Sequence, residues 1–199
     1  MATGRRPSKR AARKAETNKK LIQASWDLFA EKGFDNVTVN DIANAAGVSR
    51  RTFFRYYPSK EAVIFYLHTD HLALFRRLRE EARGKPDLGR ADFYRLLLEV
   101  GKSCVREREN FFRAHRLIGT SPALAAKDRS FDGDWEQEML GALKQFGTLP
   151  EGLPDAHMRL QAALLVGGLH EAARLWCQSG GKHRLLSLGR VVVRLVERQ

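Results

Sequence analysis

The sequence is poor in cysteine and has no long apolar run. Its two cysteines, Cys104 and Cys177, are too few for a disulfide framework and lack the spacing of paired metal ligands. We expect both to be buried thiols in a reducing compartment. A membrane-spanning helix needs about twenty predominantly apolar residues in a row, and charges interrupt every apolar stretch of this chain. These features predict a cytoplasmic protein with no membrane partner.

The sequence motifs of common enzymes are missing as well. The chain contains no Gly-x-Ser-x-Gly, no His-Glu-x-x-His and no glycine-rich phosphate loop. His68 and His71 lie three residues apart on one face of an expected helix. Without a suitable carboxylate or cysteine partner nearby, they are expected to be two surface histidines rather than metal ligands. We therefore predict no catalytic residues, no cofactor and no metal.

Acidic residues are the minority charge. Lys and Arg number 35 against 23 Asp and Glu, which gives a net charge of +12 and favours a polyanionic partner, with a solvated basic surface as the alternative. Eight of these cations lie in the first twenty residues, where only Glu16 opposes them. Such blocks often act as disordered arms that bind nucleic acid. Residues 1–16 are therefore predicted to be a basic, flexible arm whose DNA contacts are Arg5, Arg6, Lys9, Arg10, Arg13 and Lys14.

Strand patterns are nearly absent, and helical spacing of apolar residues is found throughout the chain. Capping and stop signals divide it into about nine helices, so the predicted fold class is all-α. Two of these helices, between residues 38 and 57, are short. Gly47 permits a left-handed turn between them, and Ser49 can cap the second. This is the pattern of a helix-turn-helix, whose second helix enters the major groove of DNA.

The second short helix combines arginines with an aromatic ring on the side opposite Phe53. Arg50 and Arg51 can each bind the O6 and N7 atoms of guanine, and Phe54 offers an apolar surface to thymine methyls. Tyr56 and Lys60 stand at the ends of adjoining helices and are positioned for phosphates. The alternative is a solvated arginine face that covers a core of rings.

This stretch resembles the N-terminal domain of the tetracycline-repressor (TetR) family. The resemblance covers residues 18–64 and is carried by Thr38-Val39, Ile42-Ala43, Ala46-Gly47-Val48-Ser49, Thr52-Phe53-Phe54, Tyr56-Tyr57 and Lys60-Glu61. It implies base contacts by Asn40, Arg50, Arg51 and Phe54, and phosphate contacts by Thr38, Thr52, Tyr56 and Lys60. Family members usually carry tyrosine where Phe54 stands, so this chain keeps the apolar contact and loses a hydroxyl.

The resemblance also implies a two-domain organisation. Residues 17–64 would form the three-helix DNA-binding head, and residues 65–199 a helical domain for ligand binding and dimerisation. A single long helix is expected from Ser59 to about residue 83. Small residues spaced for close helix contact mark a dimer interface in the last two helices, with packing inside one chain as the alternative. The interface candidates are Ala163, Gly167, Gly168, Ala172, Leu188, Val192 and Leu195.

Ligand sensing is implied by the resemblance and by no motif. The candidates for a ligand pocket are Phe93, Leu97, Phe112, Arg113, His115, Arg116, Trp135, Met139 and His170, and a plain core is the alternative for the apolar and aromatic members. Residues 110–140 are similar to the ligand domain of TetR-type regulators that answer to acyl-coenzyme-A-like molecules. There Arg113 or Arg116 would meet an anionic ligand group, or else lie on the surface.

The sequence thus predicts a ligand-responsive transcriptional regulator. The expected form is a homodimeric repressor that binds a palindromic operator in double-stranded DNA and is released by a small-molecule effector. Two alternatives stay open. One is a nucleoid-style protein that binds DNA without sequence preference, and the other is a helical ligand-binding module without a DNA role.

Overall fold

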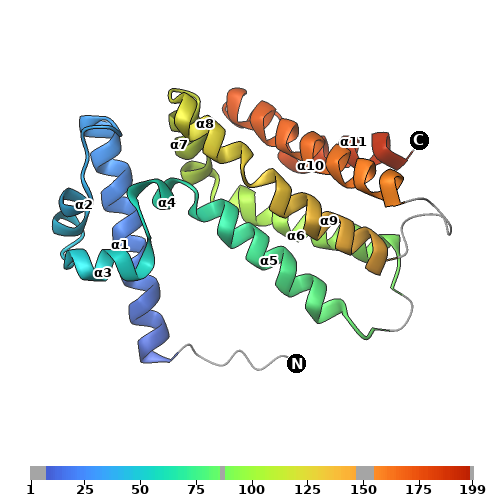
Figure 1. Ribbon diagram of the computed structural model, residues 1–199, viewed down its shortest axis with the longest axis horizontal. Coiled ribbons are helices and arrows are strands. Elements are labelled where there is room, and N and C mark those ends of the chain that lie inside the picture. Colours follow the sequence, from blue (N-terminus) through green and yellow to red (C-terminus); the bar gives the residue numbers. More distant parts are fainter. Residues whose placement is uncertain (1–7, 86–87, 147–154, 198–199) are drawn as a thin grey trace. The chain divides into compact units, whose positions relative to one another are not determined.

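The computed structural model describes residues 8–85, 88–146 and 155–197, which form eleven α-helices and no strand (Figure 1). The all-α prediction is confirmed. By its internal contacts the chain divides into two compact units, Met1–Tyr66 and Leu67–Gln199. None of the described helices is both long enough and apolar enough to cross a membrane.

The N-terminal unit contains four helices. They are α1 (Lys9–Lys32), α2 (Val39–Ala45), α3 (Arg50–Tyr56) and α4 (Lys60–Ile64). Leu21 of α1, Ile42 of α2, Phe53 of α3 and Val63 of α4 are fully buried and form the centre of this unit. The hydroxyl of Tyr57 donates to Asn18 Oδ1 at 2.6 Å and so connects the end of α3 to α1.

Helix α1 begins about two turns earlier than the sequence predicts. The Ser8 side chain caps it by accepting a hydrogen bond from the Ala11 amide at 3.2 Å. Thr17, the first residue of the predicted DNA-binding head, lies inside the helix, and its hydroxyl donates to the Arg13 carbonyl. The described part of the predicted flexible arm is therefore an exposed helix, because its alanines, lysines and arginines are strong helix formers. Arg5 and Arg6 lie outside the described residues.

The C-terminal unit is built from seven helices. They are α5 (Tyr66–Ala82), α6 (Arg90–Arg106), α7 (Arg108–Ile118), α8 (Pro122–Arg129), α9 (Asp132–Gln145), α10 (Asp155–Gln178) and α11 (Leu185–Glu197). Its core includes Phe75 of α5, Phe93 of α6, Met139 of α9 and Leu165 of α10. Four helices thus contribute to one apolar centre.

One stretch predicted as a single helix is divided into two, and a second break separates α8 from α9. The long helix expected from Ser59 is interrupted at Phe65, which ends α4 with its side chain buried. The stretch that Pro122 opens is interrupted at Ser130, whose hydroxyl donates to the Lys127 carbonyl at 2.6 Å. In both places apolar spacing continues through the break, so periodicity alone does not reveal it.

Candidate functional sites

The start of the helix-turn-helix is fixed by a reciprocal cap. The Asp41 amide donates to Thr38 Oγ1 at 3.2 Å, and the Thr38 amide donates to Asp41 Oδ2 at 2.8 Å. The Thr38 hydroxyl also donates to Asp41 Oδ2, at 2.6 Å. These hydrogen bonds lower the pKa of the Asp41 carboxyl. The observed role of Thr38 is therefore to cap α2, and its phosphate contact stays a prediction.

The turn between α2 and α3 depends on one glycine. Gly47 has a φ of +66°, in the left-handed region that disfavours residues with a β-carbon. The Val48 amide donates to the Ala43 carbonyl at 2.9 Å, and the Gly47 amide to the Asn44 carbonyl at 3.1 Å. This pair of bonds is a Schellman motif. Ser49 Oγ then accepts from the Thr52 amide at 3.1 Å and starts α3.

The exposed face of α3 carries the predicted base-reading residues. Phe53 is fully buried, whereas Arg50 and Arg51 are exposed and Phe54 keeps 44% of its surface. The Arg50 guanidinium lies 5.4 Å from the centre of the Phe54 ring, which favours one orientation of both side chains. Asn40, on α2, is exposed as well. The prediction that Phe53 faces the core and Phe54 the surface of α3 is therefore confirmed.

The predicted phosphate contacts at the end of the motif are of two kinds. Thr52 and Tyr56 are partly exposed, and Thr52 Oγ1 lies 3.0 Å from Ser49 Oγ. Lys60 is different, because its ammonium donates to the carbonyls of Phe34 at 2.7 Å and Val37 at 2.9 Å. It also lies 4.3 Å from the centre of the Phe34 ring. These hydrogen bonds stabilise the loop between α1 and α2, and the phosphate contact of Lys60 stays a prediction.

The structure brings four of the predicted pocket residues together. Phe93 and Met139 are 2% and 1% exposed and lie in the apolar core of the C-terminal unit, and their role in a ligand pocket stays a prediction. Leu97 and Trp135 pack against the same core. Phe112 contacts the Trp176 ring instead, at 4.8 Å between centroids.

The polar pocket candidates have other surroundings. Arg113 donates to Glu109 on its own helix at 3.0 Å, and Arg116 is exposed. His115 is partly buried, and burial lowers its pKa. His170 contacts two aspartates.

The predicted dimer residues also divide into two groups. A β-carbon on Gly168 would lie 2.5 Å from Val192 Cγ1, so α10 and α11 of one chain are in close contact there. Ala172 is 3% exposed. Gly168, Ala172 and Val192 thus pack within the chain. Gly167 and Leu195 are exposed, whereas Ala163 and Leu188 are half-buried.

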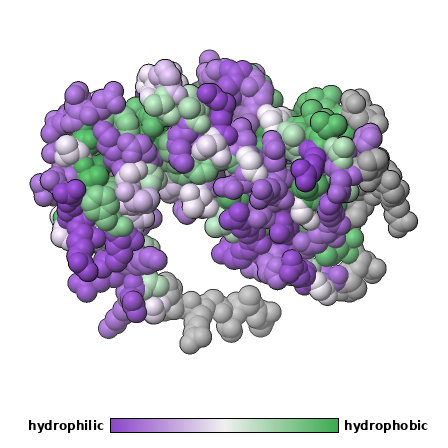
Figure 2. Space-filling view, viewed as in Figure 1, coloured by the Kyte–Doolittle hydropathy of each residue, from purple (hydrophilic) through white to green (hydrophobic). Residues whose placement is uncertain are grey.

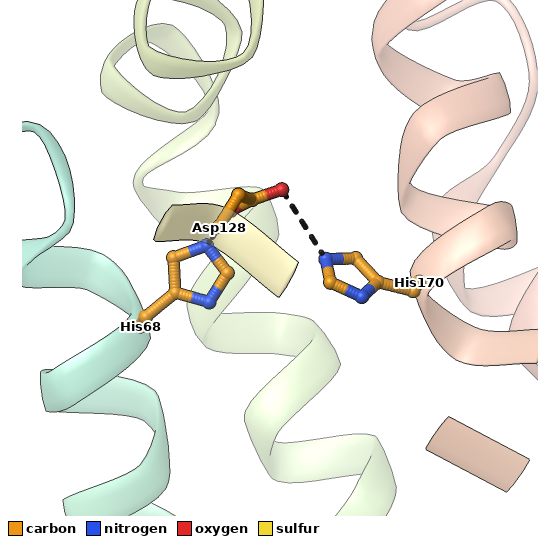
Figure 3. Close-up of side chains that lie close together, drawn as sticks. All are labelled: His68, Asp128 and His170. Atoms are coloured by element: carbon orange, nitrogen blue, oxygen red, sulfur yellow. Dashed lines mark ion pairs between the residues drawn. The ribbon is translucent and has the colours of Figure 1, made fainter. Parts of the chain in front are cut away.

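A cluster that the sequence analysis missed lies in the C-terminal unit (Figure 3). His68 Nε2 is 2.8 Å from Asp128 Oδ1, and His170 Nδ1 is 2.9 Å from Asp132 Oδ1. No local motif predicts this cluster, because its members are far apart in sequence. The predicted surface pair of His68 and His71 is wrong, because His71 is only 5% exposed. Burial lowers the pKa of His71 to about 4.

Both cysteines carry neutral thiols. Burial raises the pKa of Cys104, and also that of Cys177, to about 12. We predicted two buried thiols, and both cysteines are free and only partly buried.

Residues 21–67, which contain the whole helix-turn-helix, match the family model described as bacterial regulatory proteins, tetR family. The N-terminal domain belongs to the tetR family. Among curated proteins, the chain is 32% identical over 125 residues to a protein of Mycobacterium tuberculosis named as the mycofactocin biosynthesis transcriptional regulator MftR. The match covers 63% of each protein, so it spans less than two thirds of that relative's length.

Solved tetR-family structures share the fold of both units. Thermus thermophilus FadR, described as a TetR-family transcriptional repressor in complex with lauroyl-CoA, matches with a TM-score of 0.60 and 24% identity over 90% of this chain and 92% of that one. Bacillus subtilis FadR in complex with stearoyl-CoA matches with a TM-score of 0.63 and 20% identity over 89% and 96%. At these identities the likeness is one of fold.

The tetR-family match ends at Leu67, the first residue of the C-terminal unit.

Proposed function

We propose that this protein is a transcriptional repressor that binds a palindromic operator as a homodimer and releases it when a small molecule binds. The observation that carries the proposal is the helix α3 of a tetR-family domain. Its buried Phe53, its cap and its turn hold it in place, while Arg50, Arg51 and Phe54 face solvent. A fixed helix with an exposed guanidinium face has the chemistry that major-groove recognition requires.

Contacts to the phosphate backbone of DNA come from basic side chains of α1. The first turns of α1 expose Lys9, Arg10, Arg13 and Lys14. Cations of this kind neutralise phosphates and release counterions, so they supply affinity without sequence preference. Thr52 and Tyr56 are the remaining phosphate candidates at α3. In this division of roles, α1 increases affinity and α3 supplies discrimination.

Homodimerisation is supported by an apolar surface on the last two helices. Exposed large hydrophobic side chains gather there, and Figure 2 shows hydrophobic surface over α10 and α11. They are Leu160, Leu164, Leu175, Val191 and Leu195. A contiguous exposed apolar patch marks a contact surface, and the same face on a second copy would cover it with two-fold symmetry. Pairing would present two α3 helices to two half-sites of an operator.

The effector class that we propose to test first is an acyl-coenzyme A. It is supported by the two FadR complexes of similar fold, which hold lauroyl-CoA and stearoyl-CoA. In this chain, Arg113 and Arg116 of α7 offer cations for an anionic group. Such a ligand releases DNA only by its difference in affinity for the DNA-bound and free forms of the protein.

The test replaces the base-reading arginines one at a time. Arg50→Ala and Arg51→Ala are compared with wild type on a duplex from upstream of the gene and on a scrambled duplex of equal length. Each change should lower the operator preference by about 1–3 kcal/mol and leave scrambled binding nearly unchanged. Arg77→Ala, which removes an exposed arginine of α5, serves as the matched control. Full operator preference in both α3 variants would contradict the base-reading assignment.

The effector is tested on the same duplex. Lauroyl-CoA should release it and coenzyme A alone should not. Retention of the duplex in the presence of lauroyl-CoA would reject that effector class and leave the DNA assignment standing.

A further inference from the structure

Polar side chains from four helices meet within the C-terminal unit. Figure 3 shows Asp128 of α8 between His68 of α5 and His170 of α10. Their ligand atoms all lie within 4.8 Å of one another, and all three residues are partly buried. The fourth, Asp132, is the first residue of α9 and contacts His170 from the other side. Two imidazoles and a carboxylate thus face one point.

The orientation of His170 is fixed by Asp132. Nδ1 of His170 lies 2.9 Å from Asp132 Oδ1, so this ring nitrogen is in contact with the carboxylate. The other ring nitrogen, Nε2, lies 3.7 Å from Asp128 Oδ2. A carboxylate behind a histidine in this way is the usual support of a metal-binding imidazole.

The His68 ring is held in a similar manner. It stacks on Phe131, with 5.0 Å between centroids and 11° between planes. This contact aims Nε2 at Asp128 Oδ1, 2.8 Å away. Both histidines are therefore positioned before any ligand arrives, which lowers the ordering cost of binding one.

Asp128 lies between the two imidazoles. Its Oδ1 is 2.8 Å from His68 Nε2, and its Oδ2 is 3.7 Å from His170 Nε2. Nitrogen and oxygen atoms at these separations can share one cation, either a metal ion or a proton on an imidazole.

We propose that His68, Asp128 and His170 bind a divalent transition-metal ion such as Zn²⁺, with Asp132 orienting His170. Two imidazoles and one carboxylate suit zinc and its first-row neighbours better than Mg²⁺ or Ca²⁺, which prefer oxygen ligands. Donors on a tetrahedral zinc lie about 3.4 Å apart, given bonds of about 2.0–2.2 Å. The distance of 3.7 Å between His170 and Asp128 is close to that value, whereas the His68–Asp128 hydrogen bond would open by about 0.6 Å.

The bound ion would connect α5, α8 and α10, and its remaining coordination position would be open to water or to a donor atom of an effector. This inference replaces the sequence prediction that no metal is bound. It does not depend on the proposed DNA function, because metal binding is measured on the protein alone.

The experiment titrates metal into chelator-treated, full-length protein that carries no histidine tag. Co²⁺ is followed by its visible absorption, and Zn²⁺ by competition with a chromophoric chelator. We expect one ion per chain in wild type, and no such binding in His68→Ala or His170→Ala. Asp132→Ala, which keeps all three ligands, should lower the affinity about 10- to 100-fold. His157→Ala removes an exposed histidine of α10 and should bind as wild type does.

A second measurement distinguishes loss of metal binding from failure to fold. Far-ultraviolet circular dichroism establishes helix content without metal, and Zn²⁺ should raise the Tm of wild type and His157→Ala but not of His170→Ala. The proposal is overturned if wild type binds no stoichiometric ion. It is equally overturned if His68→Ala and His170→Ala, folded by dichroism, retain wild-type affinity.

Discussion

At the scale of single residues, one cation determines how the loop before α2 is held. The ammonium of Lys60 reaches the carbonyls of Phe34 and Val37, more than twenty residues away in sequence. Helical spacing places Lys60 near the DNA-facing end of the motif, which is why the sequence predicts a phosphate contact. The carbonyls belong to a loop whose path no periodic pattern describes. Their hydrogen bonds with Lys60 are therefore visible only in the folded domain.

Lys60→Met should therefore destabilise the protein. Hydrogen bonds to a charged donor contribute about 1.5–3 kcal/mol, so we expect the free energy of unfolding in urea to fall by that amount. Lys102→Met, which loses an exposed ion pair with Glu99, should change it by no more than about 0.5 kcal/mol. A Lys60→Met protein as stable as wild type, but with weaker binding to every duplex, would restore the phosphate assignment.

His71 should make stability depend on pH. Its pKa is lowered from 6.5 to about 4, first by burial and then by His68 and Arg106, while Glu107 opposes the shift. Between pH 6.5 and 4 the unfolded chain binds the proton more readily than the folded one, so stability falls as the pH drops through this window. The full loss attributable to His71 is about 3 kcal/mol.

This dependence is measured by urea unfolding between pH 7 and 4.5 in the presence of a chelator. His71→Gln cannot take up the proton and should show a shallower fall in stability than wild type. His183→Gln removes an exposed histidine and should follow wild type. If His71→Gln and wild type lose stability in parallel, the buried neutral histidine is not the cause.

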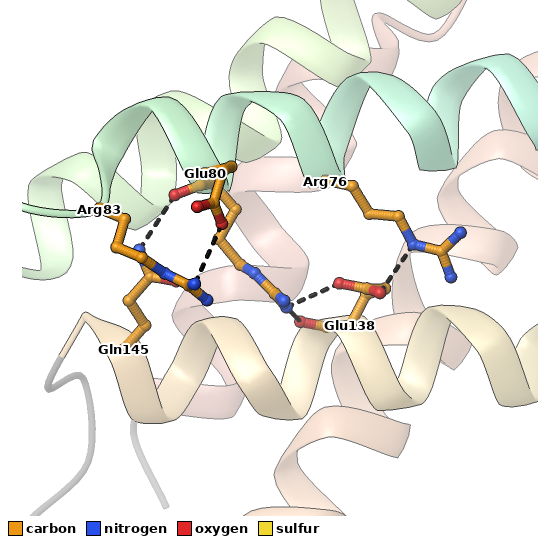
Figure 4. A network of polar contacts seen from close by, with 6 residues as sticks. Arg76, Glu80, Arg83, Glu138 and Gln145 are labelled. Carbon is orange, nitrogen blue, oxygen red and sulfur yellow. Dashed lines mark hydrogen bonds and ion pairs between the residues drawn. The ribbon is translucent and has the colours of Figure 1, made fainter.

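At the scale of helices, polar contacts as well as apolar packing hold α5 against α9. Figure 4 shows Glu138 of α9 facing α5. One carboxylate oxygen lies 2.7 Å from Arg76 Nε, and the other lies 2.7 Å from Arg79 Nη1. The side-chain amide of Gln145 donates to the Arg79 carbonyl at 3.0 Å. Sequence spacing identifies both helices, but it does not pair residues sixty positions apart.

Helices α10 and α11 approach each other at Gly168. Since an added β-carbon would lie 2.5 Å from Val192 Cγ1, Gly168→Ala should lower the free energy of unfolding by about 1–3 kcal/mol. Val192→Ala in the same chain makes room, so the double variant should lose less than the sum of the single changes.

The neighbouring glycine is the matched control for this contact. A β-carbon on Gly167 meets no atom within 4 Å among the described residues, and alanine there should stabilise the helix by about 0.5–1 kcal/mol. Equal effects of the two substitutions in thermal unfolding, at one protein concentration, would show that Gly168 is not a close-contact position.

At the scale of the whole molecule, the exposed apolar face of α10 and α11 should set the oligomeric state. Replacing Leu164 and Leu195 together by glutamate places charges on side chains that are 55% and 60% exposed. We expect the light-scattering mass to change from that of a dimer to that of a monomer, with the helix content kept. Val105→Glu, on an exposed side chain of α6, should remain dimeric. A double variant that stays dimeric would place the interface elsewhere.

The helix-turn-helix could be predicted from the sequence because its signals are local. The Gly47 turn, the Ser49 cap and the inward Phe53 act within a few residues of one another. The C-terminal unit is different. Its helices were found by spacing, but the division of α8 from α9, the core position of Met139 and the cluster around Asp128 depend on contacts between distant segments. Local patterns carry no information on such contacts, so they could not place the predicted pocket residues relative to one another.

The central claim is sequence-specific DNA binding through α3, and the most direct measurement is binding to operator and scrambled duplexes across a salt series. The account predicts a preference of about a thousandfold or more for one pseudo-palindromic site upstream of the gene. Affinity for both duplexes should fall as salt rises, because the exposed cations of α1 act on phosphates alone. Equal, steeply salt-dependent binding to every duplex would contradict the claim and support a protein that binds DNA without sequence preference.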